Sequence, residues 1–175
     1  DAKVLHIDID AAEINKNVNT YSSIIGDCKE ILKILNKRLE NQKHDKWMSK
    51  VKEYEKEFPL KYADEKELKP QYIMERISAI TKGEAIIATE VGQHQMWACQ
   101  FIDYEHPRSL LTSGGLGTMG YGLGAAIGAK AGCPDKVVFD IAGDGCFYMN
   151  NIELATSVAN DLPVIVVLIN NHVLG

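Results

Sequence analysis

The sequence predicts an α/β protein in which helices flank a parallel sheet, preceded by the end of a second α/β domain. Three observations predict this class. From residue 70 onward, apolar runs of strand length alternate with helical patterns, as in parallel sheets. A shorter strand and helix pattern lies near the N-terminus, and a lysine- and glutamate-rich stretch separates the two. We therefore expect one domain to end within 1–40, a charged linker at 41–69 and the first part of a second domain at 70–175.

The first part of the chain should contain two short strands and one helix. Apolar runs predict strands at 4–9 and 23–26, and the residues at 12–17 can form a helical turn. Asp27 is expected to cap a helix, because an acidic N-cap followed three residues later by Glu30 resembles a capping box. Apolar residues at helical spacing then give that helix an amphipathic stripe, made of Ile31, Leu32, Ile34, Leu35 and Leu39.

The second part should alternate strands with helices. A glycine-rich stretch at 114–124 continues into a helix of small residues that ends at Ala131. The other elements follow from the hydrophobic pattern, which predicts strands at 85–89, 136–141 and 163–170 and helices at 72–80, 94–101 and 151–159. Since parallel strands need long crossover connections, usually helices, this order indicates a parallel sheet.

Composition excludes several classes of function. Hydrophobic residues make up 46% and charged residues 25% of the chain, which is ordinary for a globular protein. The net charge is -5 without a basic run, so nucleic-acid binding has no electrostatic support. The longest apolar run, 162–169, is much shorter than a membrane helix. The cysteines form no CxxC pair and no signal peptide precedes them, which favours a reduced, cytoplasmic location.

One glycine motif has two interpretations. Residues 115–120 read Gly-x-Gly-x-x-Gly, and Asp140 lies twenty residues further on, as in the fingerprint of dinucleotide-binding proteins. Such matches are common in glycine-rich α/β chains, where the glycines can simply allow a tight turn and close helix packing. A nucleotide-binding module therefore stays an alternative at this point.

A second pair of motifs is more specific. A Gly-Asp-Gly sequence at 143–145 follows one expected strand, and Asn-Asn at 170–171 ends the next. Carboxyl ends of parallel strands meet at one edge of the sheet, where open α/β sheets bind ligands. Asp144 offers a carboxylate and Asn171 an amide oxygen, which suit Mg²⁺. The glycines let the backbone approach a phosphate, and a helix expected to begin near Asn150 would present its positive end. Together the motifs indicate a metal-bridged diphosphate.

This arrangement resembles the signature of thiamine-diphosphate enzymes. Three further stretches resemble the large catalytic subunits of the acetolactate synthase (acetohydroxyacid synthase) family: Val-Gly-Gln-His-Gln-Met-Trp at 91–97, Ser-Gly-Gly-Leu-Gly-Thr-Met-Gly-Tyr-Gly-Leu at 113–123 and His-Ile-Asp-Ile-Asp at 6–10. The resemblance covers nearly the whole chain and is weakest at 41–70. It implies a truncated thiamine-diphosphate-binding fold, preceded by the end of an FAD-associated domain. Since the chain starts within one expected strand and stops just after another, we expect a piece of a longer protein.

The resemblance implies roles for individual residues of the second part. The metal ligands match Asp144, Asn171 and the backbone carbonyl of Val173. Diphosphate contacts match Gln93 and His94, and the backbone of Gly145 and Cys146, where cysteine replaces the usual serine. On the residues alone, His94 could also be a residue at a helix N-terminus without a ligand.

The remaining implied contacts involve thiamine and FAD. Gly117 and Met119 match residues that line the thiamine, and Met119 is the candidate catalytic residue, an apolar wedge that holds the cofactor bent. On the residues alone, Met119 could also fill the core. FAD contacts are implied for Asp8, Ile9, Asp27 and Cys28, although Asp27 is already explained as a helix cap. Ala11 and Gly124 stand where the family usually has proline, and neither matches a ligand.

The implied activity joins two pyruvates, or pyruvate and 2-ketobutyrate, with loss of carbon dioxide, in branched-chain amino-acid biosynthesis. The implied cofactors are thiamine diphosphate, Mg²⁺ and FAD. The implied assembly is a homo-oligomer with active sites between subunits and a possible regulatory small subunit. Since the family's proton-relaying glutamate lies on a preceding domain, we expect the isolated chain to be inactive. The residues also leave open another pyruvate-type thiamine enzyme, such as a pyruvate oxidase or decarboxylase, and a non-catalytic interaction fragment.

Overall fold

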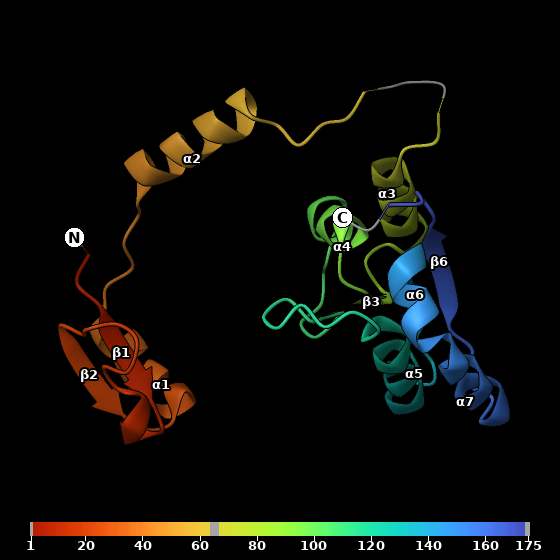
Figure 1. The fold of residues 1–175 in the computed structure, drawn as a ribbon. Coiled ribbons are helices and arrows are strands. Elements are labelled where there is room, and N and C mark those ends of the chain that lie inside the picture. The colour runs from red at the N-terminus through yellow and green to blue at the C-terminus, as the bar shows by residue number, and fades with distance from the viewer. Residues whose placement is uncertain (1, 64–66, 174–175) are drawn as a thin grey trace. The chain divides into compact units, whose positions relative to one another are not determined.

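The chain divides into two compact units in the computed structural model, which describes residues 2–63 and 67–173. The first unit is Asp1–Pro59 and the second is Leu60–Gly175. This division falls within the stretch at 41–69 that the sequence predicts as a linker, of which residues 64–66 lie outside the described parts. The predicted domain bounds themselves stay a prediction. Figure 1 shows the two units, and each is described below by itself.

The first unit pairs two short strands. β1 (Leu5–Asp8) runs parallel to β2 (Ser22–Ile25), and the 3-10 helix η1 (Ala11–Glu13) lies between them in sequence. α1 (Cys28–Arg38) begins after β2, and α2 (Asp45–Glu57) occupies part of the charged stretch. The predicted cap is present, because the side chain of Asp27 accepts a hydrogen bond from the N–H of Glu30 at 3.1 Å. No described residue of this unit is fully buried, so these elements enclose no core of their own.

The second unit contains a four-stranded sheet in which every neighbouring pair is parallel. The strand order is β4-β3-β5-β6. The strands are β3 (Ile86–Thr89), β4 (Leu110–Thr112), β5 (Val138–Gly143) and β6 (Ile165–Ile169). The predicted α/β class with a parallel sheet flanked by helices is therefore confirmed.

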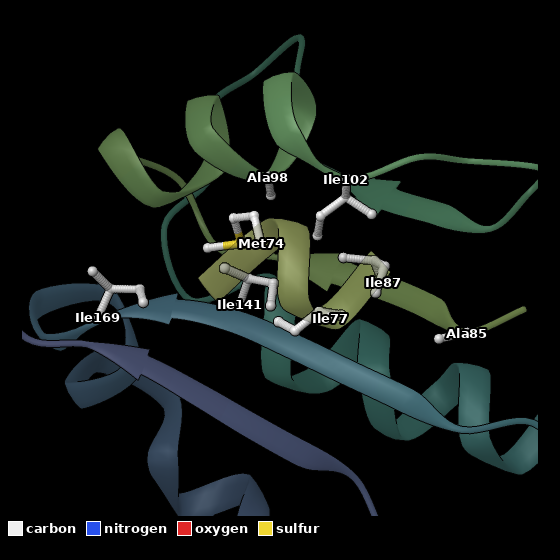
Figure 2. Packing of buried hydrophobic residues seen from close by; sticks show 8 residues of the cluster. All are labelled: Met74, Ile77, Ala85, Ile87, Ala98, Ile102, Ile141 and Ile169. Atoms are coloured by element: carbon white, nitrogen blue, oxygen red, sulfur yellow. The ribbon is translucent and has the colours of Figure 1, made fainter. Parts of the chain in front are cut away.

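Helices cover both faces of this sheet. α3 (Pro70–Thr81) and α4 (Gln93–Phe101) cover one face, where their apolar side chains meet those of β3, β5 and β6. Figure 2 shows this core, made of Met74, Ile77, Ala85, Ile87, Ala98, Ile102, Ile141 and Ile169. α5 (Gly122–Gly132) packs on the other face, where Ala126 lies against Ala88 and Val138. The small residues of α5 permit this close approach to the sheet.

The order of the strands creates a ligand-binding position. From β3 the chain passes through α4 to β4 on one side, then returns through α5 to β5 on the other side of β3. The strand order therefore reverses between β3 and β5. Open α/β sheets bind ligands in the crevice beyond the carboxyl ends of the strands at such a point. The turns that follow β3 and β5 are thus the first place to look for a site.

Two local predictions differ from the structure. The helix expected at 151–159 begins earlier, as α6 (Asp144–Asn150), η2 (Asn151–Glu153) and α7 (Leu154–Ala159). The glycine at 145 makes this segment resemble a turn in the sequence. In the structure Gly145 lies within the first turn of α6, so the helix start expected near Asn150 is wrong. β4 was not expected, because its three residues are too few to give a periodic pattern. Among the described residues, no helix combines the length and apolar character needed to cross a membrane.

The core on the α3 side predicts a difference between two methionines. Met74 is completely buried in this core, whereas Met96 on α4 is 55% exposed. We expect Met74→Ala to lower the free energy of unfolding by about 2–5 kcal/mol, because it leaves a cavity. Met96→Ala should change it by less than about 0.5 kcal/mol. Urea denaturation of both variants tests this packing, and equal effects would contradict it.

Candidate functional site

A pocket lies beyond the carboxyl ends of β3, β5 and β6. Its lining includes Val91, Gly92 and Trp97, which follow β3, and Ile169 at the end of β6. The lining also includes the residues expected from the sequence to hold a metal ion and a diphosphate: Gln93, His94, Asp144, Gly145, Cys146, Asn171 and Val173. The structure thus gathers these residues at the point where the strand order reverses.

Pairing of β5 with β6 brings the two predicted metal ligands together. Gly143 lies opposite Ile169 in the parallel register, so Asp144 and Asn171 follow neighbouring strand ends. Asp144 is the first residue of α6, with Gly143 in extended conformation before it. A carboxylate is favoured at this position, because the first N–H groups of a helix lack partners within the helix.

Hydrogen bonds orient the side chain of Asn171. Its Nδ2 donates to Oε1 of Gln93 at 3.1 Å, and its Oδ1 accepts from the N–H of Val173 at 3.1 Å. The first bond joins the turn after β3 to the turn after β6. The amide oxygen carries a second lone pair, so it can bind a cation while it accepts from Val173. The donor set of carboxylate, amide oxygen and backbone carbonyl suits Mg²⁺.

His94 is buried against the glycine that precedes Asp144. A Cβ atom on Gly143 would stand 2.8 Å from both Cε1 and Nδ1 of the imidazole. Burial lowers the pKa of His94 to about 4, although the nearby carboxylate of Asp144 acts in the opposite direction. The imidazole is therefore neutral at pH 7. Its buried Nε2 has no hydrogen-bond partner among the described residues, as expected of a group that contacts a ligand.

Cys146 ties the turn after β5 to the turn after β3. Its buried thiol donates a hydrogen bond to the carbonyl oxygen of Val91 at 2.9 Å. Burial also raises the pKa of this thiol, so it stays protonated at neutral pH. Only the thiolate is a strong nucleophile. The thiol of Cys146 therefore serves as a hydrogen-bond donor that joins the two turns, and it is not a reactive nucleophile.

The glycine-rich loop lies next to the pocket. Its residues Gly117 and Met119 are not among the residues that line the pocket. Gly117 has a φ of +64° and donates its N–H to the carbonyl oxygen of Ser113 at 3.0 Å, which closes a turn. Its missing Cβ would stand 3.9 Å from Val91, a residue of the pocket. Met119 is half-buried. The loop is therefore a neighbour of the pocket, and the thiamine contacts of both residues stay predictions.

Asp140 does not fit the dinucleotide fingerprint. The glycines at 115–120 do lie between a strand and a helix, as that motif requires. However, Asp140 has no exposed surface and points toward the start of α5, so it cannot reach the ribose of a bound nucleotide. Gly122 is instead the close-packed residue, because a Cβ there would stand 2.5 Å from Oδ1 of Asp140. These contacts disfavour the nucleotide-binding alternative.

The four residues predicted to contact FAD share one edge of the first unit. Asp8 lies opposite Ile25, and its carbonyl oxygen accepts the N–H of Gly26 at 2.8 Å. Ile9 and the pair Asp27 and Cys28 therefore follow neighbouring strand ends. The backbone N–H of Asp10 is the main cause that lowers the pKa of Asp8. The geometry fits a common contact edge, and the role of these residues toward FAD stays a prediction.

Sequence reasoning missed several residues at the site. Val91, Gly92 and Trp97 line the pocket, although only their neighbours Gln93 and His94 were assigned roles. Their position within the stretch 91–97 was the available signal. Glu90, which follows β3, and Asp140, within β5, were also missed as a pair, because the burial of two acidic side chains cannot be recognised in a polar–apolar pattern.

Several known proteins are similar to this chain. The family model "Thiamine pyrophosphate enzyme, C-terminal TPP binding domain" matches residues 90–175. The chain is 49% identical over 99% of its length to acetolactate synthase 3, chloroplastic, of Brassica napus, of which it covers 28%. It is 49% identical to the chloroplastic acetolactate synthase of Arabidopsis thaliana, over 99% of this chain and 27% of the relative. It is 46% identical to the acetolactate synthase large subunit of Corynebacterium glutamicum, over 100% of this chain and 29% of the relative.

The contact between Gly143 and His94 predicts that even one methyl group is harmful here. Gly143→Ala should displace the imidazole and lower the free energy of unfolding by about 1–3 kcal/mol. Gly128 is a matched control, because a Cβ there meets nothing within 4 Å. Gly128→Ala should be neutral or stabilise α5, since alanine favours helices. Thermal denaturation compares them, and a Gly143→Ala variant as stable as Gly128→Ala would refute the contact.

Proposed function

We propose that the chain forms the diphosphate- and metal-binding part of an acetolactate synthase, because the thiamine pyrophosphate enzyme family model matches residues 90–175 and the chain is similar to acetolactate synthases over 99% of its length. The observation that carries this proposal is the pocket in which Asp144 and Asn171 follow neighbouring parallel strands. The chain spans just over a quarter of the length of the relatives it matches. The activity proposed for the whole protein joins two 2-keto acids with loss of carbon dioxide.

The residues of the pocket fit a metal-bridged diphosphate. Asp144, the amide oxygen of Asn171 and the carbonyl of Val173 would hold Mg²⁺, since all three offer oxygen ligands. The backbone N–H groups of Gly145 and Cys146 lie in the first turn of α6, where they are free to donate to phosphate oxygens. The neutral imidazole of His94 could donate from its unpartnered nitrogen without adding charge.

Bound thiamine diphosphate would supply the nucleophile that adds to the keto group and the electron sink for loss of carbon dioxide. The residues of this chain would then bind and orient it. Gln93 and Asn171 hold each other by a hydrogen bond, which fixes both turns before the cofactor enters. Preorganised turns reduce the entropy that must be lost on binding. Met119, on the adjoining loop, would act as the apolar wedge against the thiamine.

Several finer proposals concern the complete enzyme. Asp8, Ile9, Asp27 and Cys28 would contact FAD along one edge of the first unit. A homo-oligomer with active sites between subunits, and a regulatory subunit, would complete the assembly. A cytoplasmic location is proposed from the cysteine pattern alone, and plant relatives carry the word chloroplastic in their names. The isolated chain would be inactive, because the proton-relaying glutamate is expected on another domain.

A different pyruvate-type thiamine enzyme is the second candidate. The family model describes thiamine pyrophosphate enzymes in general, which supports any member of that family. An identity of 49% to acetolactate synthases favours the first proposal. Product analysis with pyruvate separates the two. Acetolactate would support the synthase, whereas acetaldehyde or acetyl phosphate without acetolactate would exclude it.

The metal site predicts a large effect of one carboxylate. Asp144→Ala should weaken Mg²⁺-dependent binding of thiamine diphosphate to the complete enzyme at least tenfold, about 1.4 kcal/mol, because it removes the charged metal ligand. Asp135→Ala, at an exposed position, is the matched control and should leave the affinity unchanged. Isothermal titration calorimetry measures both, and an unchanged affinity in Asp144→Ala would rule out the proposed metal ligand.

Met119 should affect turnover more than binding. An apolar wedge shapes the bound cofactor but adds no charge contact to the diphosphate. Met119→Ala in the complete enzyme should therefore lower kcat about tenfold or more while the affinity for thiamine diphosphate stays within a few fold. Met149→Ala, at a 58% exposed position, is the control. A loss of affinity with normal turnover at saturation would make Met119 a packing residue instead.

A further inference from the structure

Two acidic side chains lie buried behind the cofactor pocket. Glu90 follows β3, and Asp140 lies within the neighbouring strand β5. Neither side chain has any exposed surface. The backbone N–H of Glu90 donates to the carbonyl oxygen of Ile141 at 2.9 Å, so the two acids sit on adjoining parts of the sheet. No role proposed above uses either carboxyl group.

The start of α5 covers this acid pair. Oε1 of Glu90 accepts the N–H of Leu123 in the first turn of the helix at 3.2 Å. Gly122 packs directly against Asp140, where a Cβ would stand 2.5 Å from Oδ1. Within the described residues, Oε2 of Glu90 and both carboxyl oxygens of Asp140 have no hydrogen-bond partner. The pair is therefore enclosed and mostly unsatisfied.

Two buried negative charges need a neutralising partner. The elements around the pair, α4, α6, β4, β6 and the first turn of α5, carry no lysine or arginine, and their titratable side chains are His94, Cys99, Asp144, Cys146 and Tyr148. The buried Nε2 of His94 has no hydrogen-bond partner among the described residues, so it does not pair with either acid. Among the described residues, no group of three His, Cys, Asp or Glu side chains that could hold a metal ion is found. Since isolated buried charges are very costly, a bound proton is the remaining solution.

The hydrogen bonds decide which acid holds the proton. Glu90 accepts an N–H at the positive end of α5, which stabilises its ionised form. No N–H group reaches Asp140, so nothing stabilises its charge. We propose that the pair holds one proton at neutral pH, on Asp140, and that loss of this proton weakens anion binding in the adjoining pocket. Burial, and then the charge of Glu90, raise the pKa of Asp140 to about 7, in agreement with this assignment.

The position of Cys146 connects the pair to the pocket. This residue lines the pocket, and its thiol donates a hydrogen bond to the carbonyl oxygen of Val91, the residue that follows Glu90. A second negative charge on Asp140 would therefore repel an anionic ligand bound at the turn after β5. The part of the proposal that concerns the cofactor rests on the proposed function, whereas the assignment of the proton does not.

Infrared spectroscopy tests the proton directly. In the complete enzyme, a protonated carboxyl C=O band should be present at about pH 5 and lost at about pH 9, and Asp140→Asn should remove this titrating band. Asp135→Asn, at an exposed position, should keep it. If Asp140→Asn does not fold, Glu90→Gln serves, because removal of the neighbouring charge should shift the loss of the band to lower pH. Absence of the band in the unmodified enzyme, its survival in Asp140→Asn, or an unshifted titration in Glu90→Gln would each overturn the assignment.

Stability supplies an independent measurement. The pKa of Asp140 is raised in the folded protein above its ordinary value of 3.8, so the folded state holds this proton more tightly than the unfolded chain does. The contribution of the proton to stability is complete below about pH 4 and is lost as the pH rises to about 7. In Asp135→Asn, Tm should decrease between about pH 5 and pH 8. In Asp140→Asn, this decrease should be smaller by about half or more. Equal decreases in the two variants would contradict the proposal.

Cofactor titrations test the consequence for binding. The affinity for thiamine diphosphate with Mg²⁺ should fall about threefold or more between about pH 6 and pH 8.5, and Asp140→Asn should remove most of this decrease. The same decrease in both proteins would refute the link to the pocket. The infrared and Tm measurements need neither substrate nor turnover. Failure of the proton assignment is thus distinguishable from failure of the proposed function, which acetolactate formation reports.

Discussion

Parallel pairing of β3, β5 and β6 is the constraint on which the rest of the site depends. Each of these strands ends at the same edge of the sheet, so the turns that follow them meet although they lie far apart in sequence. The hydrogen bond between Gln93 and Asn171 and the one between Cys146 and Val91 then join these turns in pairs. A slip of one residue in the pairing of β5 with β6 would shift the two strand ends relative to each other and separate Asp144 from Asn171.

Much of the fold and of the pocket could be predicted from the sequence, because the sequence patterns that indicate them are local. Alternation of strands and helices gave the class, and the Gly-Asp-Gly and Asn-Asn motifs predicted one edge for Asp144 and Asn171. The pocket confirms that these residues gather, while their roles as ligands stay predictions. The start of α6 was misplaced because glycine at 145 opposes helix formation on its own, whereas the acidic Asp144 and packing on β5 and β6 favour it.

Contacts between distant residues could not be predicted in this way. The requirement for glycine at 143 was attributed to the close approach of a phosphate, yet the nearest obstacle is the ring of His94, which belongs to another helix. In the same manner, position 122 in the glycine-rich stretch must be glycine because a Cβ atom there would collide with the side chain of Asp140, a residue of the following strand. A single sequence shows that a glycine is present and does not show which distant side chain excludes the Cβ atom.

The charges around the pocket bear on how a diphosphate could bind there. None of its lining residues is a lysine or arginine, Asp144 contributes a carboxylate, and His94 is neutral at pH 7. Behind the pocket lies the charge of the acid pair, and the whole chain carries a net charge of -5. Backbone N–H groups at the start of α6 supply only partial positive charge. A divalent cation held by Asp144 would reverse the local sign of the potential, so in this chain the affinity for the anion should depend on the metal before any chemistry begins.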